Sequence, residues 1–180
     1  MKLTLIILSS IIGLFLMGFL MVMSSQNGAI SLEETVKTSL SDIDVHLTKR
    51  FNKLNELAEC VKQYDSHEYK TLVDVISARG KNMSGKDVKQ CLASFSRLEE
   101  RYPELKSQSN YKMLMTEVSL EENHLGQSRK AYNEFVRDYN RYCRKFPTAL
   151  FLSMTGYERV QFARYETDEA MRDTKPLKLF

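Results

Sequence analysis

The most strongly apolar part of the sequence is an unbroken run from Leu3 to Met23 that contains no charged residue. As a helix that rises about 1.5 Å per residue, such a run is long enough to cross the roughly 30 Å hydrocarbon core of a bilayer. The hydrophobic cores of cleaved signal peptides are shorter and end at a small-residue cleavage site, which SSQNGAIS matches poorly. The pattern therefore favours a retained membrane anchor at residues 1–25 over a cleaved signal peptide.

Beyond this run, hydrophobic residues recur at alternating spacings of three and four, which is typical of helices that pack along a seam. Ser31 and Glu34 have the form of a helix capping box, and no further Gly or Pro follows until Gly80. We therefore expect one long helix from about Ser31 to Gly80. Its seam would consist of Val36, Leu40, Ile43, Leu47, Arg50, Leu54, Leu57, Val61, Tyr64, Glu68, Thr71, Val75 and Ala78.

The second half of the chain predicts a turn at KNMSGK, a shorter helix from about Asp87 to Arg101 that Pro103 stops, and a second long helix that ends at Pro147. The shorter helix would bury Val88, Cys91, Leu92, Phe95 and Leu98. The seam of the second long helix would be Tyr111, Met115, Val118, Glu122, Leu125, Arg129, Tyr132, Val136, Tyr139, Cys143 and Phe146.

The C-terminal part combines a short apolar helical turn, TALFLSM, with Gly156 as a stop and an extended tail, DTKPLKLF. Its aromatic residues could pack internally or form a docking patch, and we favour internal packing for Tyr157, Phe162 and Tyr165. Together, the elements predict an all-α fold: an N-terminal transmembrane helix followed by an elongated antiparallel bundle of three to four helices at residues 31–180.

The distribution of charge bears on nucleic-acid binding and on the orientation of the membrane span. The chain has 26 Lys and Arg against 23 Asp and Glu, mixed along its length, so no basic face for nucleic acid is expected. Lys2 precedes the apolar run, whereas the segment after it carries Glu33, Glu34 and Asp42 with a single Lys37. The positive-inside rule then favours an N-terminus in the cytoplasm and a bundle on the outside.

Cysteine and histidine spacing indicates no metal or cofactor site. Cys60, Cys91 and Cys143 are odd in number and far apart, which suits small apolar helix residues better than a disulfide framework or a zinc site. His67-Glu68 lacks the second histidine of a zinc-protease motif, because position 71 is threonine. Glu121 and His124 form a single E-x-x-H, whereas a di-metal bundle needs two such pairs.

Four charged residues lie on the apolar stripes of the long helices: Arg50, Glu68, Glu122 and Arg129. An unpaired buried charge costs several kcal/mol, so we expect these residues to pair with one another or with Asp44, tyrosine and backbone groups. The favoured interpretation is a structural polar network that fixes helix register. The alternative is a polar cleft that grips a ligand or the tail of a partner.

Three ordered motifs give the chain a resemblance to a known family. They are DIDVHLTKRFNKLNELAECVKQYDSHE, RYPELKSQSNY and EENHLGQSRKAYNEFVRDYNRYCRKFP. In this respect the chain resembles the LemA family of bacterial membrane-anchored helical proteins, which implies an N-terminal anchor with an antiparallel helical bundle but no established biochemical role. The charged stripe and the motif positions together give the candidate site residues Asp44, Arg50, His67, Glu68, Glu122, Arg129, Tyr132 and Asn133.

The sequence contains no phosphate-binding glycine loop, nucleophile elbow or other catalytic constellation, so we expect a protein that is not an enzyme. The leading hypothesis is a membrane-tethered scaffold of the cell envelope, held in the lipid bilayer by residues 3–23, with a membrane or envelope protein as its partner and no nucleic acid. The alternative is a binding module for a small ligand or peptide in the charged seam between helices.

Overall fold

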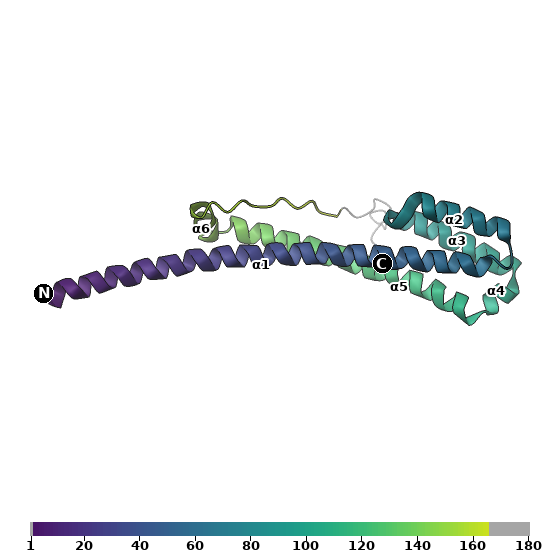
Figure 1. Cartoon of the computed structure of the whole chain (residues 1–180), viewed down its shortest axis with the longest axis horizontal. Helices are drawn as coiled ribbons and strands as arrows, with labels where there is room; N and C mark the ends of the chain where they lie inside the picture. Colours follow the sequence, from purple (N-terminus) through teal and green to yellow (C-terminus); the bar gives the residue numbers. More distant parts are fainter. Residues whose placement is uncertain (1, 166–180) are drawn as a thin grey trace, which may run out of the picture. The chain divides into compact units, whose positions relative to one another are not determined.

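The computed structural model describes residues 2–165 of the chain, so the tail predicted to be extended lies outside the described residues. Every regular element in the described range is helical, as the sequence predicts, and no strand occurs there. The elements are α1 (Lys2–Val61), α2 (Ser66–Arg79), the 3-10 turn η1 (Gly80–Asn82), α3 (Gly85–Arg101), α4 (Pro103–Ser107), α5 (Ser109–Arg144) and α6 (Thr148–Met154) (Figure 1).

The apolar run and the first packed helix are one continuous element, α1, so the expected helix start at Ser31 is wrong. A capping side chain stabilises a helix start only where the preceding residues are not helical. Here the residues before Ser31 include no proline, and the carbonyl of Ser31 accepts a bond from the Thr35 hydroxyl inside the helix. Gly28 also lies within α1, where an added Cβ atom would overlap the hydroxyl of Tyr142.

The long first helix also ends earlier than predicted, at Val61 rather than near Gly80. Asp65 has an extended backbone, and its carboxylate accepts hydrogen bonds from the backbone N–H groups of His67 and Glu68. This aspartate N-cap starts a new helix without any Gly or Pro. Gly80 does end α2, with φ of 57°, as its position in the sequence predicts.

Because α2 starts afresh, it buries different residues from those that a continuous seam would bury. Leu72 and Ile76 are buried, whereas the predicted positions Thr71, Val75 and Ala78 are exposed. The prediction fails here because the break changes the helical phase. Elsewhere, the seam fails only at Leu40, which is exposed in α1, and at Phe146, which lies beyond the end of α5.

The Asp65 cap gives a testable pH dependence. The backbone N–H of Glu68 lowers the pKa of Asp65 most, with help from the Tyr102 hydroxyl. Because the folded pKa is lowered, the cap stabilises the fold at neutral pH, and this contribution is lost as the pH falls from the ordinary value of 3.8 through the folded pKa. We expect Asp65→Ala to lower the melting temperature at pH 7 and to flatten its decline in acid. Asp65→Asn, which also caps helices well, should retain most of the stability at pH 7 in thermal circular dichroism.

The described residues divide into two compact units. The first unit contains residues 2–40 and 131–164, and the second contains residues 41–130 with Tyr165. α1 and α5 each contribute residues to both.

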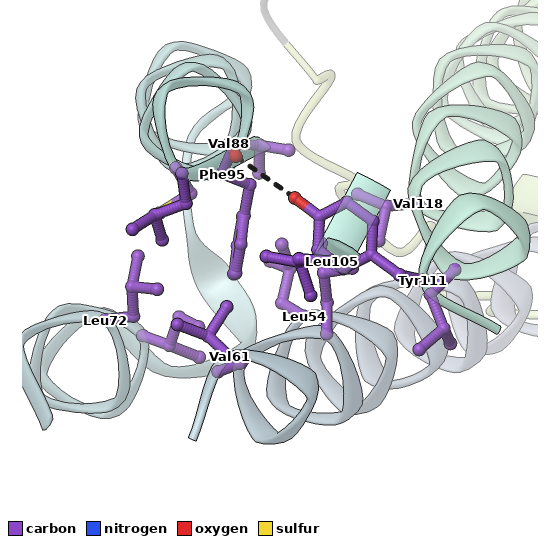
Figure 2. Packing of buried hydrophobic residues seen from close by; sticks show 14 of the residues in the cluster. Leu54, Val61, Leu72, Val88, Phe95, Leu105, Tyr111 and Val118 are labelled. Atoms are coloured by element: carbon purple, nitrogen blue, oxygen red, sulfur yellow. Dashed lines mark hydrogen bonds between the residues drawn. The ribbon is translucent and has the colours of Figure 1, made fainter. Parts of the chain in front are cut away.

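The core of the second unit brings α1, α2, α3, α4 and α5 together. Figure 2 shows this packing and the hydrogen bond of 3.1 Å from the Tyr111 hydroxyl to the carbonyl of Phe95. The predicted apolar positions of α3 are buried, apart from Leu92, which is partly buried against the same cluster. The cluster comprises Leu54, Leu57, Ala58, Val61, Leu72, Ile76, Met83, Val88, Cys91, Phe95, Leu98, Leu105, Tyr111, Leu114 and Val118.

The first unit packs the segment after α6 against α5. The Phe162 ring meets the Tyr139 ring edge-on, with 5.5 Å between centroids, and the Tyr132 hydroxyl donates to the carbonyl of Ala163 at 2.9 Å. The predicted internal packing is therefore confirmed for Phe162. The chain turns into this segment at Gly156, whose φ of 67° suits the predicted helix stop.

Candidate functional site

The centre of the candidate site is Arg50, a buried arginine on the apolar stripe of α1 with 1% of its surface exposed. Its Nη1 donates to Oε2 of Glu122 on α5 at 2.6 Å. Its Nη2 donates to the backbone carbonyl of Met83 at 2.5 Å and lies 3.4 Å from that of Lys81. One guanidinium thus joins α1, α5 and the segment that follows α2, and the expected pairing of seam charges is confirmed for Arg50 and Glu122.

Further charged pairs surround this arginine within the second unit. Lys81 donates to Asp44 at 2.6 Å, and Lys53 lies 2.9 Å from Glu117. His46 Nδ1 is 2.8 Å from Glu121 Oε2, and the His46 ring stacks on that of His124 with 5.5 Å between centroids. We call this group the Arg50 cluster: Asp44, His46, Arg50, Lys53, Lys81, Glu117, Glu121, Glu122 and His124.

Helical spacing explains why these side chains meet. His46, Arg50 and Lys53 follow one another at intervals of four and three along α1, which places them on one face. On α5, His46 and Arg50 pair with the adjacent residues Glu121 and Glu122, whereas Lys53 pairs with Glu117, one helical turn nearer the start of that helix. In the second unit, three charged pairs therefore connect one face of α1 to α5.

The predicted residues His67 and Glu68 lie outside the Arg50 cluster. His67 is exposed in the first turn of α2. The Glu68 carboxylate is 3.5 Å from Arg101, which is also 3.8 Å from Asp65. Glu68 therefore pairs with a residue that the sequence did not suggest, because the break before α2 gives it a partner on α3.

The remaining predicted residues are Arg129 in the second unit and Tyr132 and Asn133 in the first. Arg129 is half-buried, its guanidinium lies 5.5 Å from the centre of the Tyr165 ring, and its Nε has no hydrogen-bond partner among residues 2–165. Tyr132 is buried in the first unit, where its hydroxyl is bound to Ala163. Asn133 is half-buried in that unit.

A second polar group lies in the first unit around Glu33. The Tyr157 hydroxyl donates to Glu33 at 2.6 Å and lies 3.2 Å from the Tyr139 hydroxyl, which accepts the Val160 N–H at 3.0 Å. The ion pair with Lys37, together with the Tyr157 bond, lowers the pKa of Glu33. Burial first, and then the Glu33 carboxylate, raise the pKa of Tyr157. This group therefore holds the chain after α6 against α1 and α5.

The charged side chains of the Arg50 cluster and of the group around Glu33 pair with one another and link helices. Burial raises the pKa of all three cysteine thiols, which keeps them in their less nucleophilic protonated form. Within residues 2–165, no group of three or more His, Cys, Asp or Glu side chains is arranged to hold a metal ion. A shallow, open depression lies elsewhere in the second unit, and it is lined by Glu56, Glu59, Cys60, Lys62, Gln63, Gln108, Asn110 and Leu114.

Sequence reasoning placed Arg50 and Glu122 on the seam but left several of their neighbours out of the site. His46 could have been included, because it lies one helical turn before Arg50 on the same face of α1. For Glu121 the sequence offers only a weaker indication of membership in the site, namely that it is next to Glu122. Lys81 and the Met83 carbonyl come from η1 and the residue that follows it, and the period of the long helices does not predict the path of this short segment.

These observations define an all-helical protein whose N-terminal helix is long and apolar enough to span a membrane. The LemA family model matches residues 39–176, and the chain belongs to the LemA family. The matched range includes the Arg50 cluster and begins after the apolar run. No curated protein matches the chain.

Proposed function

We propose that the chain is a single-pass, membrane-tethered scaffold or interaction protein of the cell envelope, without enzymatic activity. The observation that carries this proposal is the continuity of α1. Its residues 2–21 are exposed, its apolar run has no charge, and the same helix continues without a linker into the packed units. Exposed apolar residues on this scale are stable in lipid rather than in water.

The state of the polar side chains supports a role in interaction rather than catalysis. Arg50 directs its hydrogen bonds at Glu122 and two backbone carbonyls, and Glu33 is bound by Lys37 and Tyr157. Such groups fix the packing of helices, in this account an antiparallel bundle, and present a defined surface to a partner. Lys2 precedes the span and only one basic residue, Lys37, lies in the 20 residues after it, which weakly favours an N-terminus in the cytoplasm and a bundle outside the cytoplasmic membrane.

Site-specific photo-cross-linking in the native membrane tests the scaffold proposal. The cross-linking amino acid would replace exposed residues of the full-length protein: Lys70 and Asp74 on α2, and Lys112 and Thr116 on α5. We expect one discrete protein adduct, of the same mass, from neighbouring positions on one helix and a weaker one from the other helix. Adducts absent from all four positions, with the protein intact in the membrane, would contradict the proposal.

A second candidate function rests on the depression beside Cys60. Its lining of carboxylates, amides and one lysine is suited to a small polar ligand or a peptide. Binding of such a ligand would raise the melting temperature of the full-length protein in a screen, and Gln63→Ala and Gln108→Ala would remove that increase. Both glutamines line the depression, so an unchanged increase in these variants would place the ligand elsewhere.

A further inference from the structure

The segment from the end of α5 through α6, residues 144–154, exposes three large apolar side chains. We call this segment the turn. Phe146 is 77% exposed, Leu150 51% and Met154 68%. Leu152, in contrast, is buried, so α6 has one face packed on the first unit and another that no described residue covers. Large apolar side chains grouped in this way are typical of a binding surface.

Two contacts within the first unit fix where this turn lies along α1. Before the turn, the Tyr142 hydroxyl donates to the carbonyl of Ser25 at 3.3 Å. After the turn, the Tyr157 hydroxyl is bound to Glu33. Residues 2–21 of α1 are exposed and Val22 is the first that is half-buried, so packing begins where the apolar run ends. The turn therefore lies beside the end of the proposed span (Figure 1).

The charges next to the turn are mostly positive. The last turn of α5 carries Arg141 and Arg144, and Lys145 follows it. Arg144 and Lys145 are exposed and have no carboxylate within ion-pair distance in the part of the chain that the structure describes. Basic side chains at the level of the headgroups attract the phosphates of anionic lipids.

We propose that the turn at residues 144–154 binds the membrane surface beside the span. Phe146, Leu150 and Met154 insert among the lipids at the headgroup boundary, and Arg144 and Lys145 contact lipid phosphates. The inference rests on the proposed role of α1 as a membrane anchor, because that role sets the level of the bilayer. The turn then gives the first unit a second attachment to the membrane and restricts its rotation about α1.

Tryptophan fluorescence tests this surface without background, because the chain contains no Trp. Four single-tryptophan variants of the full-length protein are placed in nanodiscs of phosphatidylcholine and phosphatidylglycerol, with and without brominated lipid chains. Leu150→Trp and Met154→Trp report on the turn, Phe15→Trp on the span, and Met113→Trp, another exposed apolar position, on the second unit. We expect blue-shifted emission and quenching by brominated lipid at positions 150, 154 and 15, but neither at position 113.

The outcomes separate this inference from the membrane anchor itself. Quenching at position 15, with emission at position 150 as unquenched and red-shifted as at position 113, would overturn the inference and leave the anchor in place. Absence of quenching at position 15 would overturn both. A blue shift at position 150 without quenching would assign the surface to a second protein copy and would also overturn the inference.

The basic residues are tested in the Leu150→Trp background. Arg144→Gln with Lys145→Gln is expected to reduce quenching in nanodiscs that contain phosphatidylglycerol and to have little effect in phosphatidylcholine alone. Circular dichroism would verify that the helices are retained. Equal quenching with and without the two basic side chains in both lipids would overturn their assignment to lipid phosphates.

Discussion

Replacing Glu122 by glutamine is expected to lower the free energy of unfolding by about 3 kcal/mol, since it removes the carboxylate that pairs with the buried guanidinium of Arg50. Arg50 is 1% exposed and the Glu122 side chain 28%, so water reaches the carboxylate but hydrates the guanidinium little once the ion pair is lost. The bonds to Met83 and Lys81 remain, which keeps the loss near the lower end for a broken buried pair. Urea unfolding of the full-length protein in mild detergent, followed by circular dichroism, gives this value.

Asp44→Asn is the matched control, because it also removes one carboxylate from the Arg50 cluster. The Asp44–Lys81 pair is exposed on both sides, so its loss should cost under about 1 kcal/mol. The double change Arg50→Met with Glu122→Gln should be more stable than Glu122→Gln alone, because no buried charge is left unpaired. Equal losses of stability for Glu122→Gln and Asp44→Asn would contradict the dependence of the buried Arg50 guanidinium on Glu122.

Phe95→Ala is expected to destabilise the second unit by about 3–5 kcal/mol, the cost typical of removing a large side chain from a closed core. The Phe95 side chain is fully buried in the cluster that joins α1 with α2, α3, α4 and α5. The bond from the Tyr111 hydroxyl goes to the backbone carbonyl of Phe95 and can persist in the variant. Urea unfolding would therefore report mainly the loss of packing.

Two controls distinguish packing from general damage. Phe95→Leu keeps most of the apolar volume and should cost less than about 1.5 kcal/mol. Met113→Ala removes an exposed apolar side chain from the same unit and should change stability by no more than about 0.5 kcal/mol. Similar effects of Phe95→Ala and Met113→Ala would mean that the core is not assembled as described.

Helical periodicity predicted the core of the long helices from the sequence. Ile43, Leu54 and Val61 on α1, and Val118 and Val136 on α5, are buried at the expected spacing. This success has a physical reason: a long helix that packs on one side must repeat its apolar residues every three or four positions. The period is therefore visible without knowledge of the packing partner.

The ends of the first helix were not predictable in the same way. Pro and Gly carry the strongest local signals for helix ends, and neither occurs between Val61 and Ser66. The break depends on Asp65, whose carboxylate caps α2. Nothing in the sequence distinguishes this aspartate from the other acidic residues of the chain. Conversely, Ser31 has capping chemistry but lies inside α1, because the preceding residues are already helical.

In the candidate site, too, the sequence predicted some contacts and not others. The positions of Arg50 and Glu122 on apolar stripes predicted that these charges need partners, and they pair with each other. The sequence could not predict that Glu68 pairs with Arg101, because this contact depends on the break before α2. A pattern of side chains cannot predict a backbone acceptor such as the Met83 carbonyl.

The central claim is that α1 holds the protein in a membrane, and extraction of cell membranes at alkaline pH tests it most directly. The wild-type protein should stay with the membranes, whereas Ile12→Arg with Phe15→Arg should release it, because each charge near the middle of a span costs about 2.5–3.5 kcal/mol on insertion scales. Leu3→Arg, at the end of the apolar run, is the matched control and should remain bound. Release of the wild-type protein, or retention of the double variant, would contradict the account.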